Sequence, residues 1–103
     1  AKHKILKINS KTLKKYGAVS QQVCKEMVQN LFKLSKSKIS ISVTGIAGPN
    51  GGTNLKPVGT VYVGVKYNKK IKIYLFNFNK KFSRNKIQNL TVASIFQIIK
   101  GLI

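Results

Sequence analysis

The segment that most restricts the fold is rich in glycine, with four glycines among residues 45–52, directly after a predicted strand. Residues 48–51 read Gly-Pro-Asn-Gly, which is typical of a tight turn, so we predict a loop over residues 45–57. Successive backbone N–H groups in turns can surround an anion, and Thr44 and Thr53 add hydroxyl donors at the edges of the loop. Neither usual glycine-rich phosphate motif fits the spacing. The residues alone therefore leave a structural connection and a ligand site as equally good interpretations.

Hydrophobic periodicity predicts the elements on either side of this loop. Helices are expected at 11–16 (ended by Gly17), at 21–34 (capped by Ser20) and at 84–100. Strands are expected at 39–43, 58–65 and 71–78, the last two forming an antiparallel hairpin. We therefore expect the α/β class: a layered α/β/α domain with a small mixed sheet that includes a β-hairpin. Three strands make a small sheet, which suggests that the N-terminal part of the domain is missing.

The apolar faces of the predicted helices indicate what lies in the core. The face of the second helix is expected to contain Val23, Cys24, Met27, Val28, Leu31 and Leu34. Cys24 lies within this stripe, so we interpret it as a buried, inert thiol rather than a nucleophile. In the last helix, Val92, Phe96 and Ile99 widen the apolar band. Such a band is either sandwiched between layers or partly used in self-association, which leaves a homo-oligomer open.

Residue counts exclude several kinds of site. The chain has one cysteine, one histidine and one acidic residue. Paired catalytic carboxylates, a multi-cysteine metal site and a complete Ser-His-Asp triad therefore cannot be built from it, and we expect neither a metal nor a cofactor. No apolar run approaches the roughly 18 residues of a membrane span, and the chain does not start like a secretory signal. We expect a cytoplasmic protein without a membrane partner.

The net charge of +19 comes from nineteen lysines and one arginine against one glutamate. A basic excess usually indicates a nucleic-acid or acidic-membrane binder. In this chain the lysines are spread over every segment, and planar bidentate readout of bases favours arginine over lysine. We therefore favour a solvated basic surface over a dedicated nucleic-acid surface. In either case nucleic acid is expected to bind only weakly and nonspecifically.

Two long runs of residues carry a resemblance to a known family. They are Ser-Val-Thr-Gly-Ile-Ala-Gly-Pro-Asn-Gly-Gly-Thr at 42–53 and Lys-Pro-Val-Gly-Thr-Val-Tyr-Val-Gly at 56–64. They resemble the signature of the CinA C-terminal family, which includes the bacterial nicotinamide-nucleotide amidases and the C-terminal domain of competence/damage-inducible CinA proteins. Segments near Tyr16 and Arg84 also resemble this family. The resemblance covers residues 1–103, and the chain is similar to the C-terminal two-thirds of the family's domain.

The resemblance implies an amidohydrolase that converts nicotinamide mononucleotide to nicotinate mononucleotide and ammonia. The family's proposed nucleophile is a serine in an upstream Glu-Ser-x-Thr-Gly-Gly segment, and its proposed base is a lysine that ends a Tyr-Ser-Asn segment. Lys2 maps onto that lysine, whereas the serine and tyrosine have no counterpart in this chain, so the chain alone is expected to be inactive. The expected substrate-binding residues are Thr44, Gly45, Ala47, Gly48, Gly51, Gly52, Thr53 and Arg84. Asn50 and Gln88 depart from the family pattern.

The residues themselves are compatible with these roles. On a helical wheel, Lys2 shares a face with Ile5 and Leu6. From this periodicity alone, the favoured interpretation is an ordinary surface lysine whose alkyl chain lies on the apolar face and whose ammonium is in solvent. Arg84 begins the last helix, where it could hold a phosphate or make a structural contact. We expect the glycine-rich loop to fold back beside Lys2 and form a shared pocket. The alternatives are a non-catalytic nucleotide-binding remnant and a lysine-rich nucleic-acid-binding protein.

Overall fold

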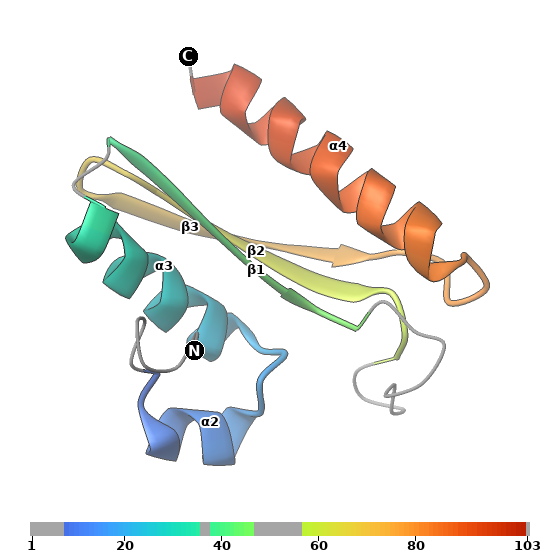
Figure 1. The fold of residues 1–103 in the computed structure, drawn as a ribbon, viewed down its shortest axis with the longest axis horizontal. Coiled ribbons are helices and arrows are strands. Elements are labelled where there is room, and N and C mark those ends of the chain that lie inside the picture. Colours follow the sequence, from blue (N-terminus) through green and yellow to red (C-terminus); the bar gives the residue numbers. More distant parts are fainter. Residues whose placement is uncertain (1–7, 36–37, 47–56, 103) are drawn as a thin grey trace. The chain divides into compact units, whose positions relative to one another are not determined.

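The computed structural model describes residues 8–35, 38–46 and 57–102. In this part of the chain, three helices and three strands follow one another (Figure 1): α2 (Ser10–Tyr16), α3 (Gln21–Ser35), β1 (Ile39–Gly45), β2 (Thr60–Tyr67), β3 (Lys70–Asn77) and α4 (Arg84–Leu102). The predicted α/β class is confirmed. The chain divides into two compact units, one formed by residues 1–44 with 62–75 and the other by residues 45–61 with 76–103.

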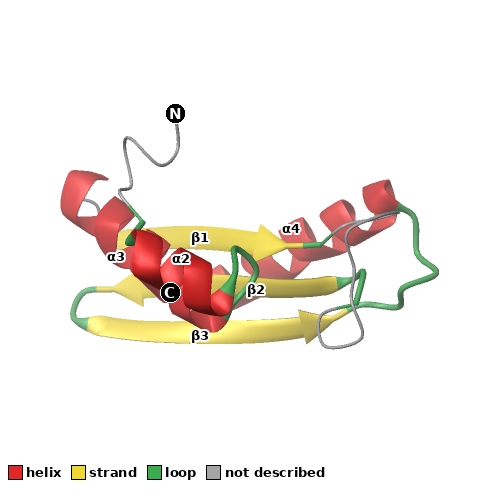
Figure 2. Cartoon of the chain, turned by 90° about the horizontal axis from the view of Figure 1, so that it is seen from below, coloured by secondary structure: helices red, strands yellow, loops and turns green. Residues whose placement is uncertain are grey.

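The strands form one sheet in the order β1-β2-β3, as Figure 2 shows. The Ile46 N–H donates to the Thr60 carbonyl at 2.9 Å, and the Asn68 N–H donates to the Lys38 carbonyl at 3.2 Å. From residue 38 to residue 46 along β1, the bonded partners run backwards from residue 68 to residue 60, so β1 and β2 are antiparallel. The predicted hairpin joins β2 to β3 through Asn68, whose φ is 56°. A mixed sheet was expected, but every strand pair among the described residues is antiparallel.

Capping residues explain where α2 and α3 begin and end. The Asn9 side chain caps α2 by accepting from the Lys11 N–H at 2.8 Å. Gly17 ends this helix by donating its N–H to the Leu13 carbonyl at 2.9 Å. The hydroxyl of Ser20 accepts from the Val23 N–H at 3.2 Å, which confirms the predicted cap of α3. Local sequence therefore sets these boundaries.

The core of the first unit lies between α3 and the sheet. Val23, Cys24 and Val28 from α3 are buried, as are Val63 and Val65 from β2. Most of the predicted stripe of α3 is buried or half-buried. One prediction was wrong: Leu34 is 56% exposed, because the stripe turns toward solvent in the last turn of the helix.

Small polar residues allow α3 to approach β1 closely. The Ser42 hydroxyl donates to the Cys24 carbonyl at 2.8 Å and lies 3.3 Å from the Cys24 sulfur. Ser40 and Ser42 are both buried, and their small side chains permit close packing on this face of β1. These bonds satisfy polar groups that burial would otherwise leave unpaired.

In the second unit, α4 buries Ile87 and Thr91. The Thr91 hydroxyl donates to the Ile87 carbonyl at 2.8 Å. Val92 and Phe96, which the sequence placed in a wide apolar band, are 50% and 61% exposed. The apolar band of α4 is therefore buried at Ile87 and Thr91 and exposed at Val92 and Phe96.

Candidate functional site

The end of β1 is fixed to the segment before α3 by a side chain of the predicted site. The Thr44 hydroxyl donates to the Ala18 carbonyl at 2.7 Å. The sequence suggested Thr44 as a donor toward a ligand, but the structure shows this proton given to the protein backbone. The oxygen of Thr44 keeps its capacity to accept a hydrogen bond. Because 26 residues separate the partners, periodicity gave no signal for this contact.

We expect the substitution Thr44→Val to lower the melting temperature of the chain by roughly 4–8 °C. The substitution removes one hydrogen bond and leaves the Ala18 carbonyl without this donor, which costs about 1 kcal/mol. Differential scanning calorimetry measures the change. Thr44→Ser keeps the hydroxyl and is the matched control, which should stay near the wild-type value. Equal losses in the two variants would contradict the assignment to this hydrogen bond, because Thr44→Ser keeps the hydroxyl and loses only the methyl group.

Gly45, the last residue of β1, lies close to the beginning of β2. A Cβ atom placed on Gly45 would lie 2.9 Å from the Cγ2 of Val61 and 3.0 Å from the Thr60 carbonyl oxygen. These distances are shorter than ordinary contacts, so a side chain at this position would require the neighbouring strand to move. Gly45 therefore has a packing role in addition to any role in binding a substrate.

Hydrogen bonds hold the two ends of the glycine-rich loop beside each other. The Ile46 carbonyl accepts from the Gly59 N–H at 2.6 Å, and the Ile46 N–H donates to Thr60. The Thr60 N–H and hydroxyl both donate to the Pro57 carbonyl, at 3.1 Å and 2.7 Å. The loop thus leaves β1 and enters β2 at ordered, bonded positions. The predicted site residues Lys2, Ala47, Gly48, Gly51, Gly52 and Thr53 lie outside the described residues.

Arg84 is the first residue of α4 and is exposed. The preceding Ser83 caps the helix, with its hydroxyl accepting from the Lys86 N–H at 3.1 Å. The first turn contains no acidic residue, so the guanidinium adds its charge to the positive end of the helix dipole. The guanidinium and the positive end of the helix dipole therefore lie together at the start of α4.

Cys24 is fully buried, as the sequence predicted. Burial raises the pKa of its thiol, and the side-chain contact with Ser42 and a hydrogen bond with the Gly64 backbone partly offset this rise. A thiol that is both buried and protonated cannot reach a substrate as a thiolate, which argues against a nucleophilic role.

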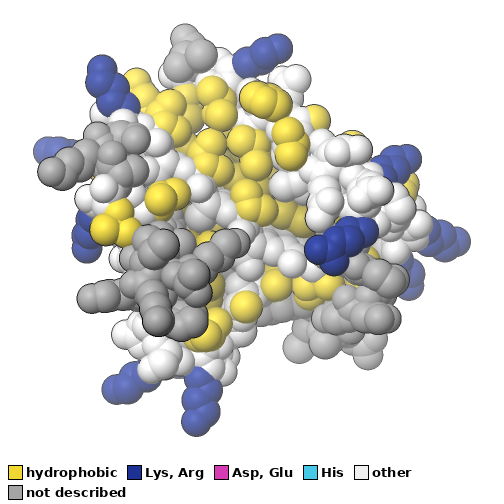
Figure 3. Space-filling view, in the orientation of Figure 1, with side chains coloured by type: hydrophobic (Ala, Val, Ile, Leu, Met, Phe, Trp, Pro, Cys, Tyr) yellow, Lys and Arg dark blue, Asp and Glu magenta, His cyan; other side chains and the backbone are white. Residues whose placement is uncertain are grey.

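Basic side chains stand apart from one another on the face that Figure 3 shows, and no acidic side chain is visible there. This distribution reflects the scattered positions of the lysines in the sequence. In the described part of the chain, no helix is both long and apolar enough to cross a membrane.

A family model and two relatives test the predicted membership of the CinA C-terminal family. The model of the CinA C-terminal domain matches residues 1–103. The chain belongs to the CinA C-terminal domain family. A CinA-like protein of Fusobacterium nucleatum is 47% identical over 103 residues, and a putative competence-damage inducible protein of Thermoanaerobacter pseudethanolicus is 44% identical over 100 residues. These alignments cover 99% and 97% of this chain but 24% of each relative, so the chain spans about a quarter of their length.

Solved structures of the CinA family have the same fold. The competence/damage inducible protein from Agrobacterium tumefaciens superposes with a TM-score of 0.91 at 30% identity, over 98% of this chain and 61% of that one. A Klebsiella pneumoniae competence damage-inducible protein gives 0.87 at 26% identity, over 95% and 60%. The recognition of the CinA family from its glycine-rich runs is therefore confirmed.

Proposed function

We propose that this chain supplies the C-terminal part of a nicotinamide-nucleotide amidase. The substrate would be nicotinamide mononucleotide, and the products nicotinate mononucleotide and ammonia. The observation that carries the proposal is the match to the CinA C-terminal domain over all 103 residues, which includes the glycine-rich runs and the position of Lys2. The names of the relatives support the family, and the activity is our inference from the resemblance.

The proposed reaction uses a serine and a lysine. The serine oxygen, from the family's upstream segment, attacks the carboxamide carbon while neutral Lys2 takes the serine proton. The resulting oxyanion would be stabilised by N–H groups of the glycine-rich loop. The Lys2 ammonium then returns its proton to the leaving nitrogen, ammonia departs, and an ester to the serine remains. Water hydrolyses this ester, which releases the carboxylate product and restores the serine.

The described residues support this proposal by what they do at the ends of the loop. Thr44 fastens the end of β1 to Ala18, and the Ile46 backbone bonds to Thr60 and to Gly59. Ordered ends reduce the conformational entropy that is lost when the site binds a substrate. Arg84, with its charge at the beginning of α4, is our candidate for the substrate phosphate.

The test joins a family member's upstream segment, which carries the Glu-Ser-x-Thr-Gly-Gly and Tyr-Ser-Asn motifs, to Ala1; we call the product the fused protein. We expect the fused protein to release ammonia and nicotinate mononucleotide from nicotinamide mononucleotide in equal amounts. Its serine-to-alanine variant and the 103-residue chain alone should release neither. A fused protein that unfolds cooperatively on heating and yet forms no ammonia would refute the proposal.

A non-catalytic nucleotide-binding protein is the second candidate. Such a protein would keep the glycine-rich loop, whose ends are held beside each other by the bonds of Ile46 to Gly59 and Thr60, without the catalytic chemistry. Isothermal titration of the 103-residue chain with nicotinamide mononucleotide separates the two. Saturable binding, combined with no turnover by the fused protein, would select the non-catalytic function.

A further inference from the structure

An open pocket lies in the first unit, where the end of α3 meets the turn between β2 and β3. Its volume is about 640 Å³, and it is lined by Phe32, Tyr67, Asn68, Lys69 and Lys70. Pockets of this size accommodate small organic ligands. None of its lining residues belongs to the predicted amidase site.

Two aromatic rings give this pocket flat, apolar walls. Phe32 comes from α3 and Tyr67 from the end of β2, and both are half-buried. The Lys66 ammonium lies over the Phe32 ring, 4.9 Å from its centroid, which holds a positive charge beside the apolar wall. Aromatic rings at a basic site are the usual platform for a nucleobase, because every base has a face that can stack.

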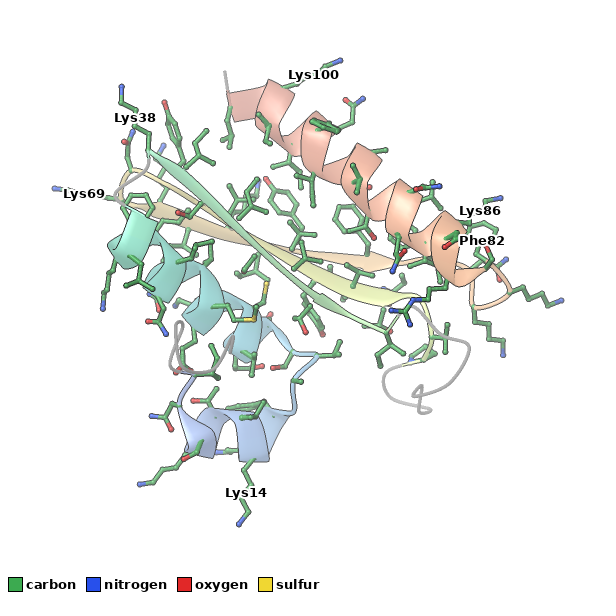
Figure 4. All side chains as sticks on the ribbon, viewed as in Figure 1. Lys14, Lys38, Lys69, Phe82, Lys86 and Lys100 are labelled. Carbon is green, nitrogen blue, oxygen red and sulfur yellow. The ribbon has the colours of Figure 1, made fainter. Side chains whose placement is uncertain are left out.

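Lysines surround the aromatic walls on several segments. Lys69 is exposed on the turn and Lys70 is exposed at the start of β3. Lys38 lies next to the turn because its carbonyl accepts from the Asn68 N–H. Figure 4 shows Lys38 and Lys69 projecting outward at the same end of the sheet. Glu26, the one acidic residue of the sequence, accepts from the Asn9 N–H and lines a different pocket. Among the described residues, no acidic side chain therefore lines the aromatic pocket.

We propose that this pocket binds single-stranded nucleic acid, with one base against Phe32 and Tyr67 and the neighbouring phosphates on the surrounding lysines. A strand places a phosphate on each side of a base, so it can use ammonium groups from Lys38, Lys66 and the turn together. A free mononucleotide has one phosphate group and leaves most of these charges unpaired. Since the cations are lysines, we expect little base selectivity and a strong dependence on salt.

The test measures binding of a fluorescein-labelled oligothymidylate of about ten nucleotides to the 103-residue chain by anisotropy. We expect Phe32→Leu and Tyr67→Leu each to weaken binding by about fivefold or more, because a stacking surface is lost. Phe32→Tyr keeps a ring and should bind like the wild type. The matched control is Phe82→Leu, because Phe82 also has a lysine over its ring, with Lys86 Nζ 4.1 Å from the centroid (Figure 4), but lies outside the pocket.

The salt dependence tests the charged part of the proposal. Lys69→Ala and Lys70→Ala should each lower the slope of log affinity against log salt concentration by about 0.7. Lys14→Ala removes the same charge from α2 and should change the slope much less. Equal effects of the pocket and control variants would overturn the proposal, as would equally tight binding of thymidine monophosphate or of duplex DNA. Circular dichroism melting of each variant separates a lost site from a lost fold.

Discussion

The variant Gly59→Ala is expected to lose a large part of the stability of this chain. Gly59 has a φ of +98°, a conformation that costs a residue with a side chain roughly 1–3 kcal/mol. A Cβ atom there would lie 2.2 Å from the Phe78 carbonyl oxygen, so the backbone would also have to move. The movement would strain the bonds that Gly59 makes to Ile46 and to Phe78. We expect a total cost of about 3 kcal/mol or more, against a typical domain stability of about 5–15 kcal/mol.

Thermal unfolding followed by circular dichroism measures this cost as a fall in melting temperature of roughly 12–20 °C. Gly101→Ala is the matched control, because nothing lies within 4 Å of a Cβ atom at that helical position. Alanine favours a helix over glycine, so this control should be neutral or slightly stabilising. A melting temperature for Gly59→Ala within a few degrees of the wild type would contradict the geometry at the start of β2.

Helix α3 shows which parts of the fold the sequence could predict. Its expected span of 21–34 differs by one residue from Gln21–Ser35, because a strong apolar period and the Ser20 cap act locally. The beginning of β2 was predicted less well. Val58 was expected to open the strand, yet β2 begins at Thr60, since the Thr60 N–H bonds to the Pro57 carbonyl in a turn and Gly59 adopts a positive φ. The hydrophobicity of Val58 gave no hint of this turn.

Long-range contacts limit how much of the candidate site could be predicted from the sequence. The glycine-rich runs identified the family, but the bond from Thr44 to Ala18 depends on how β1 packs beside the chain that enters α3. The aromatic pocket was also missed, because Phe32 and Tyr67 are 35 positions apart and join only when the β2–β3 turn meets the end of α3. The sequence did contain one indication of this pocket: Phe32 is a large apolar residue that falls outside the predicted apolar stripe of its helix.

In the fused protein, the substitution Lys2→Ala is expected to reduce ammonia release by about 10³-fold. A positioned general base contributes roughly 10²- to 10⁴-fold to a rate, and alanine can neither take the serine proton nor return it to the leaving nitrogen. The effect should fall on kcat more than on KM, because the proposed role of Lys2 is proton transfer rather than substrate binding.

Lys4→Ala is the matched control for this experiment. It removes the same charge two residues away, at a position that the helical wheel places on another face. Its kcat should stay near that of the unsubstituted fused protein. A comparable fall in both variants would point to the general basic charge of this segment rather than to a base at Lys2.

The most direct measurement is therefore the initial rate of ammonia release from nicotinamide mononucleotide by the fused protein, with and without Lys2→Ala. We expect a readily measurable rate that the substitution reduces about 10³-fold while Lys4→Ala leaves it nearly unchanged. An active fused protein that keeps its full rate after Lys2→Ala would contradict the assignment of this lysine. A folded fused protein that releases no ammonia would contradict the amidase function as a whole.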